Sequence, residues 1–171
     1  MQHSRAQAYL ALSVATLTFA ANFSVWVLYA VLGLELRDQL QLSATELGLL
    51  LSSPIFTGAF LRLPAGVLAE YYPPKALFLW QMALLLPPLL LLNYAATLSD
   101  FILLGLALGL SGVSFTIGIR YVVDWFDSKD QGTAMGIFGA GNAGAAITLI
   151  LTPLIIEFAG FKLVGPFYAA G

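Results

Sequence analysis

Cysteine is absent from the 171-residue chain, and charged residues make up only 9% of it. Without cysteine there can be no disulfide, thiolate metal site or cysteine nucleophile. Soluble domains carry about 25% charged residues, so a chain this poor in charge and 60% hydrophobic is predicted to be an integral membrane protein. The formal net charge of −2 gives no sign of nucleic-acid binding. No nucleophile–base pair, metal-ligand cluster or cofactor motif is present, and we expect neither an enzyme nor a bound cofactor or metal.

The few charged residues are separated by long apolar intervals. A transmembrane helix needs about 20 such residues, so we expect an all-α, polytopic membrane helix bundle embedded in the lipid bilayer. Five helices are predicted, with the start of a sixth from 163: 9–34, 44–69, 76–97, 100–126 and 132–157. The first uncharged interval, residues 6–34, exceeds the roughly 15-residue limit of a signal-peptide core and predicts a retained helix. Ser43 and Glu46 have the spacing of a capping box that opens the second helix.

The basic residues of the loops predict an orientation. In this topology four of them lie on the side of the N-terminus: Arg5, Lys75, Arg120 and Lys129. Two others, Arg37 and Lys162, lie on the opposite side. The positive-inside rule therefore favours a multi-pass protein of the cell (inner or plasma) membrane with its N-terminus in the cytoplasm.

One charge, Arg62, lies inside the apolar run LGLLLSSPIFTGAFLRLPAGVLA of the second helix. It precedes Glu70 by eight residues, which places it roughly 12 Å inside the edge of a hydrocarbon core about 30 Å thick. An unpaired guanidinium at that depth costs about 3 kcal/mol on insertion scales. Arg62 therefore needs either a protein acceptor or an anion.

The fifth helix begins with the small-residue run GTAMGIFGAGNAGAA. Small residues let helix backbones approach closely, which explains most of these glycines but does not explain Asn142. Asn142 follows Gln131 by eleven residues and lies roughly 16 Å deep, a depth similar to that of Arg62. A hydrogen bond from Asn142 to a neighbouring helix is the simpler interpretation of this amide. Two polar groups at one depth instead favour a central anion site.

Two segments carry a family resemblance. GVLAEYYPPK resembles the loop after the second helix of the major facilitator superfamily, Gly-x-Leu-Ala-Asp-Arg-x-Gly-x-Arg/Lys, with Gly66, Glu70 and Lys75 at its glycine, acid and base. Glutamate replaces aspartate here, and Pro73 stands where glycine is usual. QGTAMGIFGAGNAGAA resembles the nitrate signature on the fifth helix of the nitrate/nitrite porter family, and residues 54–66 are similar to that family's second helix.

The resemblance implies the N-terminal half of a major facilitator fold, five spans plus the start of a sixth, with the C-terminal half missing from this chain. It implies that Arg62 binds the anion and that Asn142 lines the substrate path. Three flanking glycines are implied to line the same path: Gly139, Gly141 and Gly144. Phe115 matches an aromatic that packs against the anion, although an isolated aromatic is more simply interpreted as a core residue.

Physical chemistry supports an oxyanion at Arg62. Nitrate and nitrite are flat and low in charge density, and the planar guanidinium fork suits bidentate contact with their oxygens. Arg120 lies within reach of the membrane interface and has Asp124 four residues later, so we interpret it as an ion pair with a structural or gating role. Gly66, Glu70 and Lys75 are expected to share that role.

The sequence thus predicts half of a transporter that moves nitrate or nitrite by alternating access of two six-helix halves. Its partners would be the anion, the bilayer and the missing half, and we expect no transport by the chain alone. No Asp or Glu lies deep in a span, so proton symport and nitrate/nitrite exchange both stay open. Two alternatives remain: a facilitator for another small anion, and a truncated remnant that does not transport.

Overall fold

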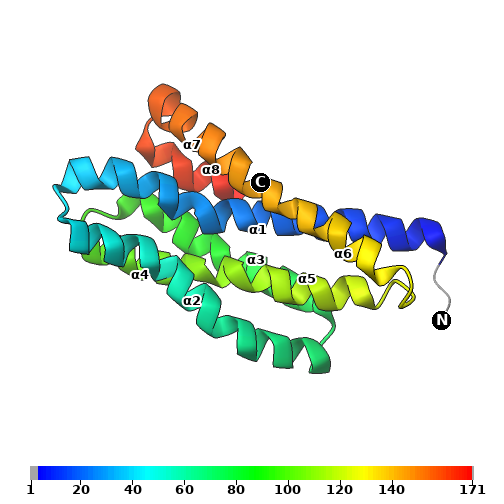
Figure 1. The fold of residues 1–171 in the computed structure, drawn as a ribbon. Coiled ribbons are helices and arrows are strands. Elements are labelled where there is room, and N and C mark those ends of the chain that lie inside the picture. Colours follow the sequence, from blue (N-terminus) through cyan, green and yellow to red (C-terminus); the bar gives the residue numbers. More distant parts are fainter. Residues whose placement is uncertain (1–3, 171) are drawn as a thin grey trace.

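The computed structural model describes residues 4–170, and helices account for its architecture (Figure 1). Five helical stretches in this range are long and apolar enough to cross a membrane: Arg5–Leu40, Ala44–Tyr71, Pro74–Tyr94, Leu98–Val123 and Gln131–Ala159. Their axes run side by side along the bundle in Figure 1. Residues 4–170 contain no β-strand. The predicted all-α membrane bundle is confirmed.

Helix α1 (Arg5–Leu40) continues six residues past the end expected at residue 34. Residues 35–40, which were expected to be a loop, extend the helix by about one and a half turns, and their side chains stabilise it. The Gln39 side chain donates to the Glu35 carboxylate at 2.6 Å, and Leu36 is buried. The helix ends at Gln41, whose φ of 52° is left-handed.

Helix α2 (Ala44–Tyr71) begins at the predicted capping box, which is confirmed. The Glu46 carboxylate accepts from the Ser43 backbone N–H at 2.9 Å, and the Glu46 N–H donates to the Ser43 hydroxyl oxygen at 3.3 Å. Pro54 lies inside this helix and has no N–H for the Leu50 carbonyl. The Ser53 hydroxyl donates to that carbonyl at 2.8 Å, so the proline leaves no buried acceptor unpaired there.

The fourth and fifth spans are each interrupted by a short 3-10 segment. Helices α4 (Leu98–Leu108) and α5 (Ser114–Val123) are joined by η2 (Gly109–Val113). Helices α6 (Gln131–Gly139) and α7 (Gly144–Ala159) are joined by η3 (Ala140–Ala143). Helix α3 (Pro74–Leu91) is followed by the 3-10 segment η1 (Leu92–Tyr94). Helix α8 (Val164–Ala170) is preceded by the 3-10 segment η4 (Phe161–Leu163).

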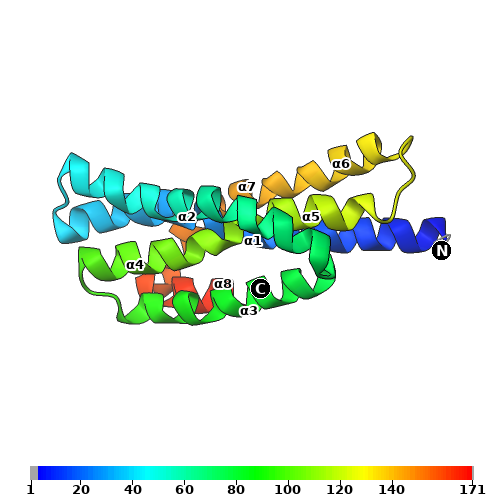
Figure 2. The ribbon, with the colours of Figure 1, turned by 90° about the horizontal axis from the view of Figure 1, so that it is seen from below.

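Helix α1 lies between the other elements and contributes more buried hydrophobic residues than any other helix. It packs along α7 on one side and against α2 and α5 on the others, while α8 lies beside α3 (Figure 2). Its residues Leu28, Tyr29 and Leu32 are at most 1% exposed. The Tyr29 hydroxyl donates to the Phe101 carbonyl at 2.6 Å, which satisfies a polar group deep in the bundle. The core thus fixes α1 against both interrupted spans.

Candidate functional site

A cavity of about 200 Å³ lies where η2 and η3 interrupt their spans. Three residues singled out in the sequence line it together: Arg62 from α2, Phe115 from α5 and Asn142 from η3. They are joined there by other residues that sequence analysis did not single out: Phe19, Phe23, Trp26, Gly112 and Ser114. The structure therefore brings Arg62 and Asn142, which are 80 positions apart, to one place.

Arg62 is half-buried and has neutral protein partners. Its Nε–H donates to the Gly112 carbonyl at 3.3 Å, and its Cζ lies 4.9 Å from the centre of the Trp26 ring. No carboxylate within residues 4–170 forms an ion pair with it. Guanidinium has five N–H donors, so the bond to Gly112 leaves the two terminal amino groups without a hydrogen-bond partner in this part of the chain.

Two glycines and a proline carbonyl hold the Trp26 indole in place. Its Nε1–H donates to the Pro54 carbonyl at 3.3 Å, which ties α1 to α2. A Cβ at Gly58 would lie 3.1 Å from the Trp26 Nε1, and one at Gly112 would lie 3.2 Å from Cε2. Both positions must therefore be small for the ring to fit between α2 and η2. A cation–π contact between two half-buried side chains such as these is worth about 1–2 kcal/mol.

One wall of the cavity is aromatic. Phe115 lies 5.4 Å from Phe19 and 5.9 Å from Phe138 between ring centroids, and Phe23 packs on Trp26 at 5.5 Å. Phe115 is 37% exposed, so it both packs in this cluster and borders the cavity. Apolar walls lower the local dielectric constant and strengthen the field of the guanidinium.

Asn142 hydrogen-bonds within its own span. Its Nδ2 donates to the Gly139 carbonyl at 2.9 Å, so the bond to a neighbouring helix that seemed the simpler interpretation is not formed. The side chain is exposed, and its carbonyl has no partner among the described residues. The free carbonyl is an acceptor, and Nδ2, which uses one of its two N–H groups on Gly139, retains one donor at the cavity that Asn142 lines.

The three glycines predicted to line the substrate path lie in two environments, and none of them lines the cavity. Gly141 and Gly144 face α1, where a Cβ would run into the Phe19 ring and the Ala20 carbonyl respectively. Gly139 has open space where a Cβ would lie. The structure thus gives Gly141 and Gly144 a packing role, and a part in the substrate path stays a prediction for all three.

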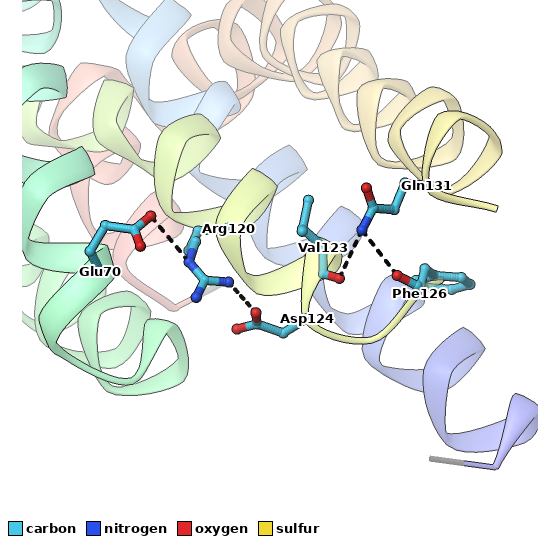
Figure 3. A network of polar contacts seen from close by, with 6 residues as sticks. All are labelled: Glu70, Arg120, Val123, Asp124, Phe126 and Gln131. Carbon is cyan, nitrogen blue, oxygen red and sulfur yellow. Dashed lines mark hydrogen bonds and ion pairs between the residues drawn. The ribbon is translucent and has the colours of Figure 1, made fainter. Parts of the chain in front are cut away.

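Three of the residues expected to have a structural or gating role lie close together: Glu70, Arg120 and Asp124 (Figure 3). Arg120 Nε lies 3.3 Å from Glu70 Oε1, and Arg120 also pairs with Asp124, the predicted partner. Gln131 Nε2 donates to the Phe126 carbonyl at 3.1 Å and fastens the start of α6 to the end of the fourth span. Glu70 belongs to α2, so this network joins three spans.

The other two members of that group do not join the network. Gly66 faces Thr116 of α5, whose Cγ2 would lie 3.5 Å from a Cβ at that position. Lys75 is exposed and forms no salt bridge within the described residues. Side chains of Arg120, Glu70 and Asp124 are themselves at least 33% exposed, and exposed pairs contribute at most about 1 kcal/mol to stability.

A buried amide pair links α1, α3 and η2. Gln81 of α3 donates through Nε2 to Asn22 Oδ1 at 2.5 Å and to the Leu110 carbonyl of η2 at 3.4 Å. Both side chains are at most 4% exposed. The signal for Gln81 was present in the sequence, since it is a lone polar residue in the apolar run ALFLWQMALLL. Two backbone carbonyls of η2 thus accept hydrogen bonds from side chains of other helices: Gly112 from Arg62 and Leu110 from Gln81.

Five membrane-competent helices, with a cavity lined by the half-buried cation Arg62, define a multi-pass α-helical membrane protein. The chain belongs to the Major Facilitator Superfamily, whose model matches residues 14–171. The fold and the family agree with the resemblance found in the sequence.

Relatives within this superfamily are named as nitrate or nitrite transporters. The chain is 34% identical over 143 residues to a probable nitrate/nitrite antiporter NarK1 of Thermus thermophilus, covering 84% of this chain and 32% of that protein. It is 33% identical to a nitrite extrusion protein of Bacillus subtilis and 31% identical to a probable nitrate transporter NarT of Staphylococcus carnosus. Each of these two matches covers 90% of this chain and 39% of the relative. The chain therefore spans about a third to two fifths of the length of these relatives.

Proposed function

We propose that this chain forms the N-terminal half of a membrane transporter for nitrate or nitrite, and that the anion binds beside Arg62. The observation that carries the proposal is the guanidinium, which is half-buried, permanently charged and paired with no carboxylate within residues 4–170. The names of the relatives support the choice of anion.

The geometry of Arg62 suits a small planar oxyanion. Its Nε is occupied by Gly112, so the free edge of the fork offers two amino groups side by side. Two parallel N–H···O bonds to one anion are the strongest arrangement that a guanidinium makes with an oxyanion. The cavity of about 200 Å³ has room for such an anion and a few waters, since one water takes about 30 Å³ of liquid volume.

Transport itself requires a second bundle in this proposal. Facilitator-type transporters rock two halves about a site at their interface, near the middle of the membrane. Asn142 and Phe115, both exposed here, would be covered by that second half when the anion is enclosed. With the N-terminus in the cytoplasm, the network of Glu70, Arg120 and Asp124 would lie at the cytoplasmic end and control opening there.

The test is substrate competition in proteoliposomes that contain the complete gene product with this sequence. Counterflow of labelled nitrate is measured with unlabelled nitrate, nitrite, formate, chloride and sulfate as competitors, with and without a pH gradient. We expect nitrate and nitrite to compete at the lowest concentrations. Stronger competition by a different anion would assign the cavity to that anion. Absence of any anion flux would favour a remnant that does not transport.

A further inference from the structure

Ser114 is a buried serine on the wall of the Arg62 cavity. It is the first residue of α5, two positions after the Gly112 carbonyl that holds Arg62. The residue is 1% exposed, yet it lines the cavity. Its hydroxyl has no hydrogen-bond partner within residues 4–170, and unlike the fully enclosed unpartnered atoms Gln81 Oε1 and Asn93 Oδ1 it keeps contact with the cavity.

The other buried serine and threonine hydroxyls of the described chain are all bonded. Ser24, Ser53 and Ser111 donate to carbonyls three or four residues earlier, at 2.7–2.9 Å. Thr148 donates to the Ser24 carbonyl at 2.8 Å, and Thr152 shares a bond of 2.8 Å with the Tyr168 hydroxyl. Serine inside a helix normally satisfies itself in this way. Ser114 is the exception, and it is the one that borders the cavity.

The two carbonyls that the Ser114 hydroxyl would normally use already have donors. The carbonyl four residues before Ser114 belongs to Leu110, and it accepts from Gln81 Nε2 at 3.4 Å. The carbonyl three residues before belongs to Ser111, and it accepts from the Ser114 backbone N–H across the end of η2. Each of these carbonyls therefore already accepts one hydrogen bond, and the Ser114 hydroxyl adds no second one.

We propose that the Ser114 hydroxyl donates a hydrogen bond to the oxyanion held by Arg62, a contact that rests on the function proposed above. One short segment then supplies three parts of the site: the Gly112 carbonyl orients Arg62, Ser114 adds a neutral donor, and Phe115 forms the wall. An unbonded hydroxyl at the wall of an open cavity can pair with water or with an anion there. The anion completes its hydrogen bonding without competing with an existing bond.

Ser111 provides a matched control. It is also buried and lies in η2, three residues earlier, but its hydroxyl donates to the Leu108 carbonyl at 2.7 Å and it does not line the cavity. Ser114→Ala removes a hydroxyl that bonds to no protein group. Ser111→Ala removes one that satisfies a buried carbonyl. If both serines had only a structural role, Ser111→Ala would lower Tm more than Ser114→Ala, and neither variant would change the nitrate KM.

The experiment measures nitrate KM, maximal rate and Tm for the complete gene product and both variants, using labelled nitrate in proteoliposomes. Ser114→Ala is expected to raise KM about tenfold or more, since a hydrogen bond to a charged group is being lost, with the Tm without nitrate unchanged. Ser111→Ala is expected to lower Tm and leave KM within twofold. Ser114→Thr, which keeps the hydroxyl, is expected to keep KM closer to that of the original protein than Ser114→Ala does.

Three results would overturn the proposal: an unchanged KM in Ser114→Ala, an equal rise in KM in Ser111→Ala, or a lower Tm in Ser114→Ala without a change in KM. Failure of the proposed function gives a different result, because the unmodified protein would then carry neither nitrate nor nitrite. In that case the role of Ser114 is overturned with it. Normal transport together with a normal Ser114→Ala variant would overturn the role of Ser114 alone.

Discussion

Arg62 shows how a cation can be held inside an apolar bundle without an acid. The half-buried Trp26 ring contributes about 1–2 kcal/mol, and a hydrogen bond from a charged donor about 1.5–3 kcal/mol. Together these contacts are comparable with the cost of about 3 kcal/mol for inserting arginine in the middle of a membrane helix. Neutral partners leave no carboxylate to compete with an incoming anion. The sequence posed a choice between a protein acceptor and an anion, and the structure provides the acceptor in Gly112.

The first residue-scale prediction concerns Trp26. Trp26→Leu removes both the ring face under Arg62 and the indole N–H that binds the Pro54 carbonyl. Without the cation–π contact that positions Arg62, nitrate binding should weaken by about 1–2 kcal/mol, which is a rise of roughly 5- to 30-fold in nitrate KM. Trp26→Phe should raise KM less, because phenylalanine keeps an aromatic ring. The measurement is transport kinetics in proteoliposomes. Trp80→Leu is the control, since Trp80 is 69% exposed and does not line the cavity. Equal effects of the two leucine variants would contradict a specific role for Trp26.

At the residue scale, the sequence predicted part of this site. Arg62 and Asn142 stood out because a polar group within a long apolar run is unusual. Trp26 gave no such signal, since an aromatic residue is ordinary in a membrane helix and its contact depends on how α1 crosses α2. Ser114 also gave none, because buried serines usually bond to their own helix. Both depend on contacts between helices, which spacing along one helix does not specify.

At the scale of elements, the glycine-rich fifth span packs closely on α1. The Ser24 hydroxyl donates to the Gly144 carbonyl at 3.0 Å, and Thr148 donates back to the Ser24 carbonyl at 2.8 Å. Such bonds between helices form only where the backbones approach closely, which small residues permit. The position of α7 against α1 in turn determines where η3 carries Asn142.

An element-scale prediction follows from the two environments of these glycines. A Cβ at Gly144 would run into the Ala20 carbonyl, whereas one at Gly136 meets nothing within 4 Å. Gly144→Ala should therefore push α7 away from α1 and destabilise the bundle by about 1–3 kcal/mol, the usual range for overpacking. Gly136→Ala should be neutral or slightly stabilising, because alanine favours helix. Thermal unfolding in detergent measures both, and an equal change in Tm in the two variants would contradict a specific close contact at Gly144.

The helices themselves were predictable, and their ends less so. Long uncharged intervals indicate spans, and the spacing of Ser43 and Glu46 correctly marked the start of α2. The continuation of α1 to Leu40 was not predicted, because a charged run after an apolar one resembles a loop. The 3-10 segments η2 and η3 were also missed: glycine content predicts close packing but does not predict the hydrogen-bond pattern that results.

At the scale of the whole molecule, the site lies on one bundle but is open. Asn142 is exposed and Phe115 is 37% exposed, so an anion beside Arg62 would contact solvent as well as protein. The curated relatives are two and a half to three times longer than the segments that match, consistent with a second bundle in those proteins. Enclosure of the anion is therefore expected to need residues beyond the five spans described.

The whole-molecule prediction is that these 171 residues do not transport by themselves. The purified chain, reconstituted in liposomes, should show no uptake of labelled nitrate above that of protein-free liposomes. The physical reason is that one bundle cannot alternate access around a site at its own surface. The complete gene product, reconstituted in parallel, is the control. Nitrate uptake by the chain that is lost in an Arg62→Lys version would show that one bundle suffices.

The most direct measurement of the role of Arg62 is nitrate and nitrite counterflow by the complete gene product carrying Arg62→Lys. Lysine keeps the charge but lacks the planar fork, so transport should fall at least 100-fold, which corresponds to about 3 kcal/mol. Arg37→Lys is the control, because Arg37 is exposed near the end of α1 and far along the chain from the cavity residues. It should transport normally. Undiminished nitrate and nitrite counterflow in Arg62→Lys would contradict an anion site at this arginine.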